Sequence, residues 1–409
     1  MVEPLRKPGR KNPLKRTRVQ SLPPMARSRA GMLLTGAAAE GRFALQCCEE
    51  CGAFCYPAHD VCPVCLSVDL AVKDAPTGGT LVSETTVRVP TDVYFRERAP
   101  WRIGLVKLDC GPIMVAHLHA DCHDGERTRM SLQLDKAGQA VAFARPTEKT
   151  ENMADDRQWR EMTASPKFRR VLVTNGRSAV GQAAAATLAE AGATVFVGVA
   201  DPWKPFAGEG SLSAYQTVPL DVTDERSVRD LAADLGGRVD ILINTSEHIR
   251  PGGLLERRTT STIRDEIAQN YLGLVHLAQA FGPAMRGRGA DGINSAAAWV
   301  NVMSVYALAN WAPFGTYSAI EAACLSLSHC LRNELRPGGV RVVNLFTGPL
   351  DTEWFQTVPP PKVAPKAVAN AIVAALEDGV EDVFVGDVAE DIRRRLASNS
   401  KALERDLGT

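Results

Sequence analysis

The sequence lacks the features that mark several classes of protein. Lys and Arg together number 47, as do Asp and Glu, so a formal net charge of zero gives no overall attraction to nucleic acid or to a membrane surface. No apolar run approaches the roughly 20 residues of a membrane-spanning helix, and no signal-peptide pattern opens the chain. We therefore expect a cytoplasmic protein of two or three domains that does not enter a membrane.

Signs of disulfide bonding are missing as well, although the chain has ten cysteines. Six of them are crowded between Cys47 and Cys65, and the other four are scattered. In a cytoplasmic protein this distribution is more typical of metal ligation than of a disulfide framework.

The crowded segment contains two Cys-x-x-Cys pairs separated by ten residues. This spacing allows four thiolates to surround one zinc ion tetrahedrally, and a closed shell of this kind is structural. Cys47 and Cys55 are additional thiols that could replace a neighbouring ligand, but only the paired cysteines fit a zinc ribbon. His59 lies between the pairs, and we interpret it as a loop side chain because four thiolates complete the shell. The predicted ligands are Cys48, Cys51, Cys62 and Cys65.

Three histidines alternate near the end of a predicted strand, at His117, His119 and His123. They offer either a second metal site or an exposed strand face. Because no carboxylate or cysteine lies at a suitable spacing, we favour the exposed face.

Changes in composition divide the chain into five segments. Residues 1–30 hold nine basic residues and predict a disordered tail, either a solvated leader or a patch for nucleic acid or a partner. Residues 31–66 predict one short helix and the zinc ribbon. Val- and Thr-rich stretches over residues 67–146 predict the strands of a small OB-type β-barrel. Residues 147–168 are polar and predict a linker, and residues 169–409 form the last domain.

The last domain has a different pattern, in which apolar strands alternate with helices. Its predicted strands include VLVT, TVFVGVA, DILIN, WVNVMS and VRVVNLF. This alternation predicts a parallel, doubly wound α/β sheet of the Rossmann type.

The cysteine segment and the strands after it resemble the zinc-ribbon/OB-fold accessory subunits of thiolases and acyl-CoA aldolases. The runs that carry the resemblance are LQCCEECGAFCYPAHDVCPVCLS, GGTLVSETTVRVP and PWRIGLVKLDCGPIMVAHL, within residues 29–146. The resemblance implies that this half binds a thiolase-like or aldolase-like protein and helps to hold its acyl-CoA.

An OB barrel can also bind single-stranded nucleic acid where aromatic and basic residues alternate on its surface. One loop offers a weak version of that pattern, with Tyr94, Phe95, Arg96, Arg98, Trp101 and Arg102. We keep nucleic acid as a less favoured alternative, because the same loop also suits acyl-CoA or a partner protein.

The run VLVTNGRSAVGQAAAATLAEAGATVFV resembles the opening of a short-chain dehydrogenase/reductase, which carries Thr-Gly-x-x-x-Gly-x-Gly here. Asn175 and Ala179 replace the first two glycines, and Gly181 keeps the third. The first two serve the tight turn and the pyrophosphate, whereas the third serves helix–strand packing. Gly176 can restore some freedom to the turn, but the degenerate motif argues against binding of NAD(P).

Two further segments correspond to the family's cofactor cleft. Asp221 and Val222 match its adenine-side Asp-Val, and Asn244 opens a segment that the family writes as Asn-Asn-Ala-Gly. Here that segment reads Asn-Thr-Ser-Glu, which puts Glu247 where a glycine normally lines the cleft. Asp201 lies beyond the residue that usually discriminates NAD from NADP, so the resemblance indicates no preference.

The family's catalytic positions are partly kept. Asn270, Ser304 and Tyr317 match its Asn, Ser and Tyr, whereas Glu321 replaces the Lys that follows one helical turn after the Tyr. A Lys there lowers the pKa of the phenol and binds the nicotinamide ribose, but a carboxylate disfavours the phenolate. We interpret this group as a relic or a weak site, which leans toward a pseudo-dehydrogenase without excluding an enzyme.

We favour a non-catalytic or weakly catalytic subunit of an acyl-CoA-processing complex, with the Rossmann half as a scaffold and as a homo- or hetero-oligomer interface through its long helices. Oxidation of a 3-hydroxyacyl-CoA precedes cleavage of a 3-oxoacyl-CoA, and linking the two units raises their effective concentration. The alternatives are an active NAD(P)-dependent 3-hydroxyacyl-CoA dehydrogenase, which in reverse is a 3-oxoacyl-CoA reductase, and a single-stranded nucleic-acid-binding module.

Overall fold

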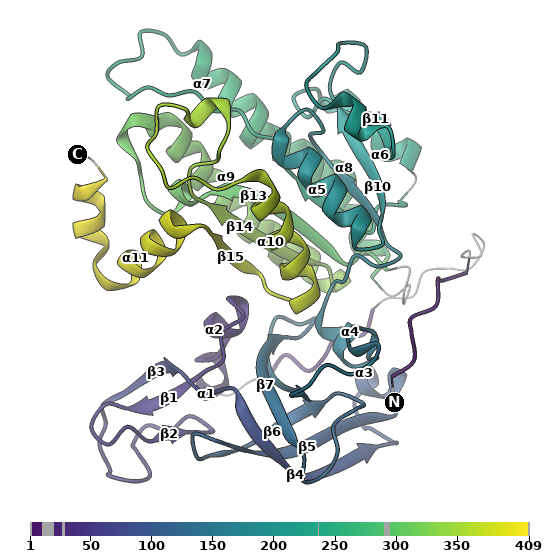
Figure 1. Ribbon diagram of the computed structural model, residues 1–409, viewed down its shortest axis with the longest axis vertical. Coiled ribbons are helices and arrows are strands. Elements are labelled where there is room, and N and C mark those ends of the chain that lie inside the picture. Colours follow the sequence, from purple (N-terminus) through teal and green to yellow (C-terminus); the bar gives the residue numbers. More distant parts are fainter. Residues whose placement is uncertain (1, 10–19, 27–28, 236, 290–294, 408–409) are drawn as a thin grey trace. The chain divides into compact units, whose positions relative to one another are not determined.

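A computed structural model describes residues 2–9, 20–26, 29–235, 237–289 and 295–407 (Figure 1). It divides into two compact units. The first comprises the described residues of 1–7, 20–164 and 377–381, and the second comprises those of 8–19, 165–376 and 382–409. No helix among the described residues combines the length and the apolar character needed to cross a membrane.

The predicted disordered tail lies partly outside the described residues, at positions 1, 10–19 and 27–28. The described part departs from the prediction. Val2 is buried, and the backbone N–H of Leu5 donates to the carboxylate of Asp155 at 2.9 Å. These contacts place the first residues of the chain against the first unit, a position that a count of basic residues does not reveal.

The first unit begins with a ribbon of three antiparallel strands in the order β2-β1-β3. Two short helices precede it where one was predicted, because Gly31 and Gly36 weaken a continuous helix. Leu34 and Leu45 belong to the same core cluster as barrel residues, so the ribbon and the barrel share a core. The elements are α1 (Arg29–Met32), α2 (Thr35–Ala39), β1 (Ala44–Cys48), β2 (Phe54–Cys55) and β3 (Leu70–Asp74).

The barrel closes in the strand order β4-β5-β6-β8-β7, as the OB-type prediction requires. Buried and exposed residues alternate along β5 and β6, which directs every second side chain into the barrel. The parallel pairing of β6 with β8 is short and consists of His117 with Phe143 and Leu118 with Ala144. The elements are β4 (Gly78–Val87), α3 (Val93–Glu97), β5 (Trp101–Leu108), β6 (Ile113–Leu118), β7 (Arg127–Leu134) and β8 (Ala140–Pro146).

The segment predicted as a linker, residues 147–168, is largely packed against the barrel. It contains a 3-10 turn (Met153–Asp155) and α4 (Trp159–Met162). The Trp159 and Met162 side chains are buried in one cluster with Trp101 and Phe143. The linker prediction rested on the polar composition of the segment and gave no weight to Trp159 and Met162. Burial of these two large apolar side chains gives the segment a defined position.

The second unit is a seven-stranded sheet in the order β11-β10-β9-β12-β13-β14-β15, with parallel pairing throughout. Helices cover both faces of the sheet (Figure 1), so the predicted doubly wound Rossmann-type fold is confirmed. The strands are β9 (Arg170–Val173), β10 (Thr194–Val199), β11 (Gln216–Pro219), β12 (Ile241–Asn244), β13 (Ala298–Ser304), β14 (Arg341–Thr347) and β15 (Asp382–Val385).

The helices of the second unit connect these strands and bury one apolar side each. One hydrophobic core cluster joins Leu172 and Trp299 in the sheet to Leu277 and Leu325 on the helices. The helices are α5 (Ala179–Glu190), α6 (Glu225–Leu235), α7 (Ser261–Glu266), a π-helical segment (Ile267–Leu272), α8 (Gly273–Gly287), α9 (Gly315–Leu335), α10 (Pro365–Asp378) and α11 (Asp387–Asp406).

Candidate functional site

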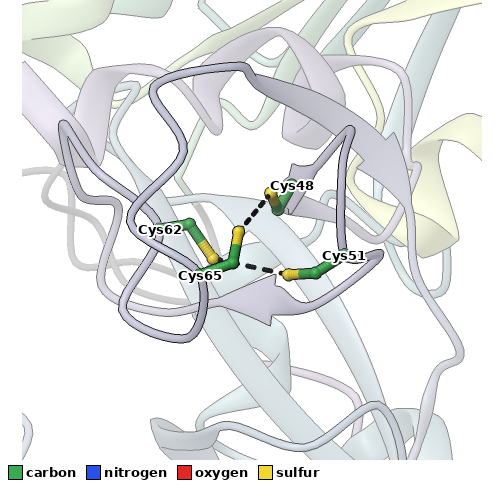
Figure 2. Close-up of side chains that lie close together, drawn as sticks. All are labelled: Cys48, Cys51, Cys62 and Cys65. Atoms are coloured by element: carbon green, nitrogen blue, oxygen red, sulfur yellow. Dashed lines mark hydrogen bonds between the residues drawn. The ribbon is translucent and has the colours of Figure 1, made fainter.

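The four paired cysteines converge at the tip of the ribbon (Figure 2). Their sulfur atoms all lie within 4.8 Å of one another, with 3.5 Å between Cys48 and Cys65 and 3.6 Å between Cys51 and Cys62. Four thiolates at ~2.3 Å from a central zinc would be about 3.8 Å apart. The donor set and its spacing therefore fit a structural zinc ion with no open coordination position.

Backbone turns hold the two cysteine pairs in this geometry. The N–H of Gly52 donates to the carbonyl of Cys48 at 3.0 Å, and the N–H of Leu66 donates to that of Cys62 at 2.9 Å. Gly52 and Leu66 both adopt positive φ, at 71° and 67°, which turns the chain after each pair. Backbone N–H groups of Cys65 and Val64 directed at Cys62 lower the pKa of its thiol to about 6. A lowered pKa favours the thiolate, which is the form that binds metal.

The other thiols near the ribbon donate to backbone carbonyls. Cys47 donates to the carbonyls of Cys48 and Gly52, and Cys55 donates to that of Ala53. Within the described part of the chain, the four paired cysteines form the single His/Cys/Asp/Glu cluster suited to a metal ion. The predicted ligand set therefore agrees with the geometry.

The histidines near the end of β6 do not form a second metal cluster. His119 is fully buried, its Nε2 lies 2.9 Å from the carbonyl of Met153, and its Nδ1 accepts from the N–H of Asp121 at 3.1 Å. The Nδ1 of His117 accepts from the indole N–H of Trp101 at 2.8 Å. The expectation of an exposed face is wrong for His119, because the following loop covers it.

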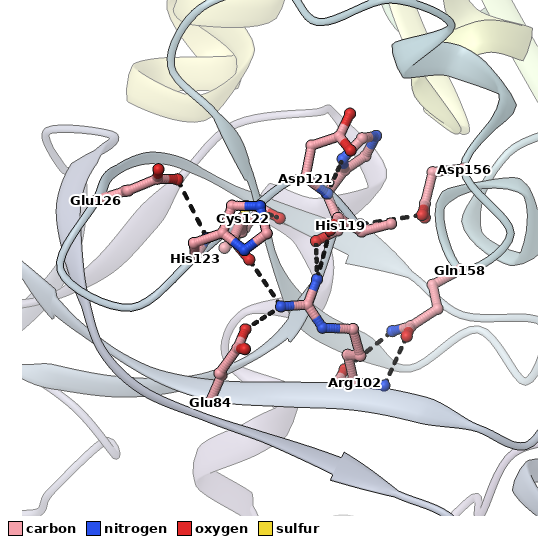
Figure 3. A network of polar contacts seen from close by, with 11 residues as sticks. Glu84, Arg102, His119, Asp121, Cys122, His123, Glu126, Asp156 and Gln158 are labelled. Carbon is pink, nitrogen blue, oxygen red and sulfur yellow. Dashed lines mark hydrogen bonds and ion pairs between the residues drawn. The ribbon is translucent and has the colours of Figure 1, made fainter. Parts of the chain in front are cut away.

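A polar network fixes that loop (Figure 3). The guanidinium of Arg102 donates to the carbonyls of His119, Ala120 and Cys122 and pairs with Glu84. The amide of Gln158 bonds both the N–H and the carbonyl of the same arginine. Arg102 thus acts as a structural anchor, which the sequence analysis had treated as part of a binding loop.

Two of the three aromatic residues predicted for base stacking are not available for it. Tyr94 and Trp101 are 1% and 2% exposed, and the Tyr94 hydroxyl donates to Glu161 at 3.1 Å. A base needs an exposed ring face, so these two rings belong to the packing of the barrel, and only Phe95 is partly exposed.

In the second unit, the turn between β9 and α5 carries the degenerate glycine motif. The Ser178 hydroxyl accepts from the N–H of Gly181 at 2.9 Å and donates to the carbonyl of Asn175 at 3.0 Å. A Cβ on Gly181 would lie 1.8 Å from that carbonyl, and one on Gly176 would lie 2.4 Å from Val197. Both glycines are therefore required by packing, whereas Asn175 and Ala179 occupy the turn without such a requirement.

Two long side chains from this turn hold the segment after β10, a role that the sequence analysis missed. Arg177 donates to the carbonyls of Ala200, Asp201 and Lys204, each at 2.7 Å. Gln182 donates to the carbonyls of Gly176 and Ala207. The segment is thereby tied to the first turn of α5.

The remaining residues predicted for the cofactor cleft make local structural bonds. Asp221 accepts from the N–H and hydroxyl of Thr223, and the carbonyl of Val222 lies 2.9 Å from Nδ1 of His276. The side chain of Asn244 accepts from the Thr174 hydroxyl at 3.2 Å.

The residues at the catalytic positions form one buried cluster. The Tyr317 hydroxyl donates to the carboxylate of Glu247, which comes from the loop after β12. Glu321 lies on the same helix as Tyr317, and its carboxylate accepts from the N–H of Ser304 at 2.9 Å. Tyr317 is fully buried and Glu321 is 5% exposed. The Tyr317 hydroxyl, which in an active enzyme would face a substrate carbonyl, therefore donates its hydrogen bond to a carboxylate of the protein.

The electrostatics of this cluster oppose formation of a phenolate. Burial and the charges of Glu247 and Glu321 raise the pKa of Tyr317 well above its ordinary value. Burial, with the charge of Glu247, raises the pKa of Glu321 to about 8. Desolvation of its carboxyl group also raises the pKa of Glu247, against the opposing hydrogen bond from Tyr317, although the residue as a whole is exposed. All three groups thus favour their neutral forms.

Asn270 lies in the π-helical segment that precedes α8. Its side chain accepts from the N–H of His248 at 2.7 Å and donates to the carbonyl of the same residue at 2.9 Å. This pair of hydrogen bonds to the backbone of His248 fixes the loop that carries Glu247. Sequence reasoning placed Glu247 in the cofactor cleft but did not find its bond to Tyr317, which links residues 70 positions apart.

Three family models match successive parts of the chain. The rubredoxin-like zinc ribbon domain of ChsH2 matches residues 35–71, and its C-terminal OB-fold domain matches residues 72–135. The short chain dehydrogenase model matches residues 169–362.

Relatives of the second half carry oxidoreductase names. An uncharacterized oxidoreductase of Mycobacterium tuberculosis (strain ATCC 25618 / H37Rv) is 31% identical over 257 residues, which cover 59% of this chain and 70% of the relative. An uncharacterized oxidoreductase of Staphylococcus aureus (strain USA300) is 30% identical over 217 residues, which cover 50% of this chain and 89% of the relative.

A solved structure shows the same relationship. A short chain dehydrogenase from Burkholderia cenocepacia J2315, in complex with NADP, is 31% identical with a TM-score of 0.54. The similarity covers 60% of this chain and 99% of that one.

Proposed function

The chain belongs to the short-chain dehydrogenase family, with ChsH2-type zinc ribbon and OB domains fused before the dehydrogenase domain, and from that premise we propose that it is a non-catalytic or weakly catalytic subunit of an acyl-CoA-processing complex. The first unit binds a thiolase-like or aldolase-like partner and its acyl-CoA. The second unit serves as a scaffold and an oligomer interface.

One observation carries the non-catalytic part of this proposal. The hydroxyl of Tyr317 donates to Glu247 and has Glu321 one helical turn away, where the family's Lys would lie. An acid–base tyrosine must exchange its proton with the substrate, so both its hydrogen bond and its pKa have to suit that exchange. Glu247 and Glu321 disfavour this proton exchange, because each carboxylate raises the pKa of the phenol.

The NADP complex of the Burkholderia relative supports NAD(P) as a ligand of this fold, against the expectation from the degenerate motif, but several residues here depart from those that the family uses for hydride transfer. Asn175 and Ala179 replace the glycines of the turn and of the pyrophosphate contact. The Lys that would bind the nicotinamide ribose is absent from position 321. We therefore assign the domain no step that uses NAD(P).

The acyl-CoA part rests on the match to ChsH2-type domains and on the zinc ribbon being structural. A closed thiolate shell stabilises the ribbon but supplies no Lewis acid to a substrate. The first unit is thus suited to binding rather than to catalysis.

A second candidate function is an active 3-hydroxyacyl-CoA dehydrogenase. The NADP complex of the Burkholderia relative favours it, because that protein shares 31% identity over almost its whole length. In this case Tyr317 would need to release Glu247 before it and Ser304 could act on a carbonyl.

Titration of the purified full-length chain with NADH and NADPH separates the two candidates. Our proposal predicts no saturable binding at micromolar concentrations and at most slow oxidation of NADPH in the presence of acetoacetyl-CoA. Rapid turnover of acetoacetyl-CoA would overturn it. Co-purification of the tagged chain with a thiolase-like or aldolase-like protein from the native host tests the partner independently.

A further inference from the structure

The wall of the barrel opens where β6 and β8 separate. Their parallel pairing covers His117 with Phe143 and Leu118 with Ala144, and then stops. In the same register, the next three pairs would join residues 114–116 to residues 140–142. These six residues instead line a cavity of about 310 Å³.

The ribbon closes the outer side of this cavity. Leu45 and Gln46 of β1 and the segment from Cys55 to Ala58 contribute to its lining. Gln46 holds that segment, because its side-chain amide bonds both the N–H and the carbonyl of His59, at 2.7 and 2.8 Å. The ribbon and the barrel share one core, so the wall that the ribbon contributes is in place before a ligand arrives.

The chemistry of the lining points to an apolar guest. Ile103, Met114, Val115, Leu132 and Val141 present hydrocarbon, and three alanines (Ala116, Ala140 and Ala142) leave the space unfilled. None of the lining side chains is Lys, Arg, Asp or Glu. A charged ligand would therefore lose its hydration without gaining an ion pair.

The parted strands add a polar feature to these apolar walls. A strand edge without its neighbour presents N–H and C=O groups, to which an amide-containing chain can add. A cavity of this volume also holds on the order of ten water-sized groups at ~30 Å³ each. A medium-length acyl chain continued by an amide-containing arm matches both the volume and the edge.

We infer that the gap between β6 and β8, closed by the ribbon, binds the acyl chain of a medium-chain acyl thioester. This inference rests on the proposed acyl-CoA function and specifies where the substrate's apolar part lies. The first unit then selects acyl-CoA by chain length.

The experiment uses the zinc-loaded full chain and calorimetric titration. The probes are CoA, hexanoyl-CoA, octanoyl-CoA and decanoyl-CoA, together with the CoA-free thioester mimic S-octanoyl-N-acetylcysteamine. Each buried methylene should improve the affinity about fourfold until the cavity is full. Equal affinity for hexanoyl-CoA and octanoyl-CoA would overturn the inference.

Two valines provide a matched pair of variants. Val115 lines the cavity and is 54% exposed, whereas Val82 lies outside its lining and is 55% exposed. Because both side chains are largely in solvent, Trp at either position should leave the fold intact, which circular dichroism checks. V115W should weaken octanoyl-CoA binding at least tenfold and abolish the dependence on chain length, while V82W should retain both. Equal effects of the two substitutions would contradict the inference.

The CoA-free mimic separates this inference from the proposed function. Binding of S-octanoyl-N-acetylcysteamine that V115W removes, with no gain from the CoA moiety, would support the acyl cavity and count against the acyl-CoA function. Binding of CoA and acyl-CoA with no dependence on the acyl chain would support that function and overturn the cavity.

Discussion

The four-cysteine site and the Tyr317 cluster each bring together polar side chains from separate parts of the chain, but they differ in how well those side chains suit one task. All four cysteines supply the same ligand to the same point, at spacings that fit one metal ion. Around Tyr317, two carboxylates replace a glycine and a lysine of the family pattern; Glu247 accepts the hydrogen bond of the hydroxyl, and Glu321 accepts from the N–H of Ser304. The first site fits its chemistry, whereas the second departs from the family's catalytic pattern.

The largest effect should come from breaking the zinc site. Cys48→Ser removes one ligand, whereas Cys47→Ser changes the adjacent buried thiol that points to backbone carbonyls. Structural zinc contributes roughly 10–16 kcal/mol of apparent binding free energy in small zinc-finger peptides. We expect C48S to lose zinc in metal analysis and to expose the ribbon to proteolysis, and C47S to retain one zinc per chain. Retention of tightly bound zinc by C48S would refute the ligand set.

The pH dependence of stability should distinguish the Tyr317 cluster from an ordinary active site. The pKa of Glu321 is raised to about 8 in the folded protein from an ordinary value of 4.5. Its stabilising contribution is complete below pH 4.5 and declines as the pH rises toward 8, because the unfolded chain releases the proton first. The decline is at most about 1.4 kcal/mol per pH unit.

Urea unfolding of the full chain at several pH values between 5.5 and 8.5 measures how the free energy of unfolding of the second unit declines with pH. The Glu321→Gln variant keeps a neutral side chain at all these values and should show a flatter profile. An identical slope in the variant and in the unsubstituted protein would show that Glu321 does not hold the extra proton.

Tyr317→Phe should reduce stability rather than activity. The substitution removes the donor to Glu247, and because that residue is exposed, water can replace the lost bond, which limits the cost to about 0.5–1.5 kcal/mol. Tyr306→Phe is the control, because Tyr306 is also buried and the structure shows no hydrogen bond of its hydroxyl among the described residues. Chemical denaturation of both variants checks the difference; equal stabilities would mean that the bond to Glu247 contributes nothing.

The smallest effect is expected from restoring the family's Lys alone. E321K leaves Glu247 on the Tyr317 hydroxyl and leaves Asn175 and Ala179 in the turn. We therefore expect no measurable reduction of acetoacetyl-CoA with NADPH. Rapid turnover by this single variant would show that the other departures do not obstruct the reaction, and the combined variant N175G/A179G/E247G/E321K provides the comparison.

The sequence predicted the parts of this molecule that depend on local pattern. The Cys-x-x-Cys spacing indicated the metal ligands, and alternating apolar strands and helices indicated the parallel sheet. The spacing of Ser304, Tyr317 and Glu321 also indicated an altered catalytic group. Each of these signals lies within a short stretch of chain, where spacing along the sequence fixes spacing in the fold.

Long-range contacts were beyond such reasoning. The bond from Tyr317 to Glu247 joins residues 70 positions apart, and Arg102 holds carbonyls 17 to 20 residues away. The burial of Trp159 likewise depends on Phe143 and Trp101, which come from two different strands. Only the tertiary fold decides whether such side chains face solvent, a ligand or one another.

The short pairing of β6 with β8 also affects how the barrel moves. Two residue pairs join these strands, whereas eight join β4 to β5. Local opening is cheapest where the fewest ladder bonds must break, so backbone amides along residues 114–116 and 140–142 should exchange their hydrogens sooner than those in the middle of β5. The wall can thus breathe along this one seam, admitting a long flexible molecule sideways while the remaining strands stay closed.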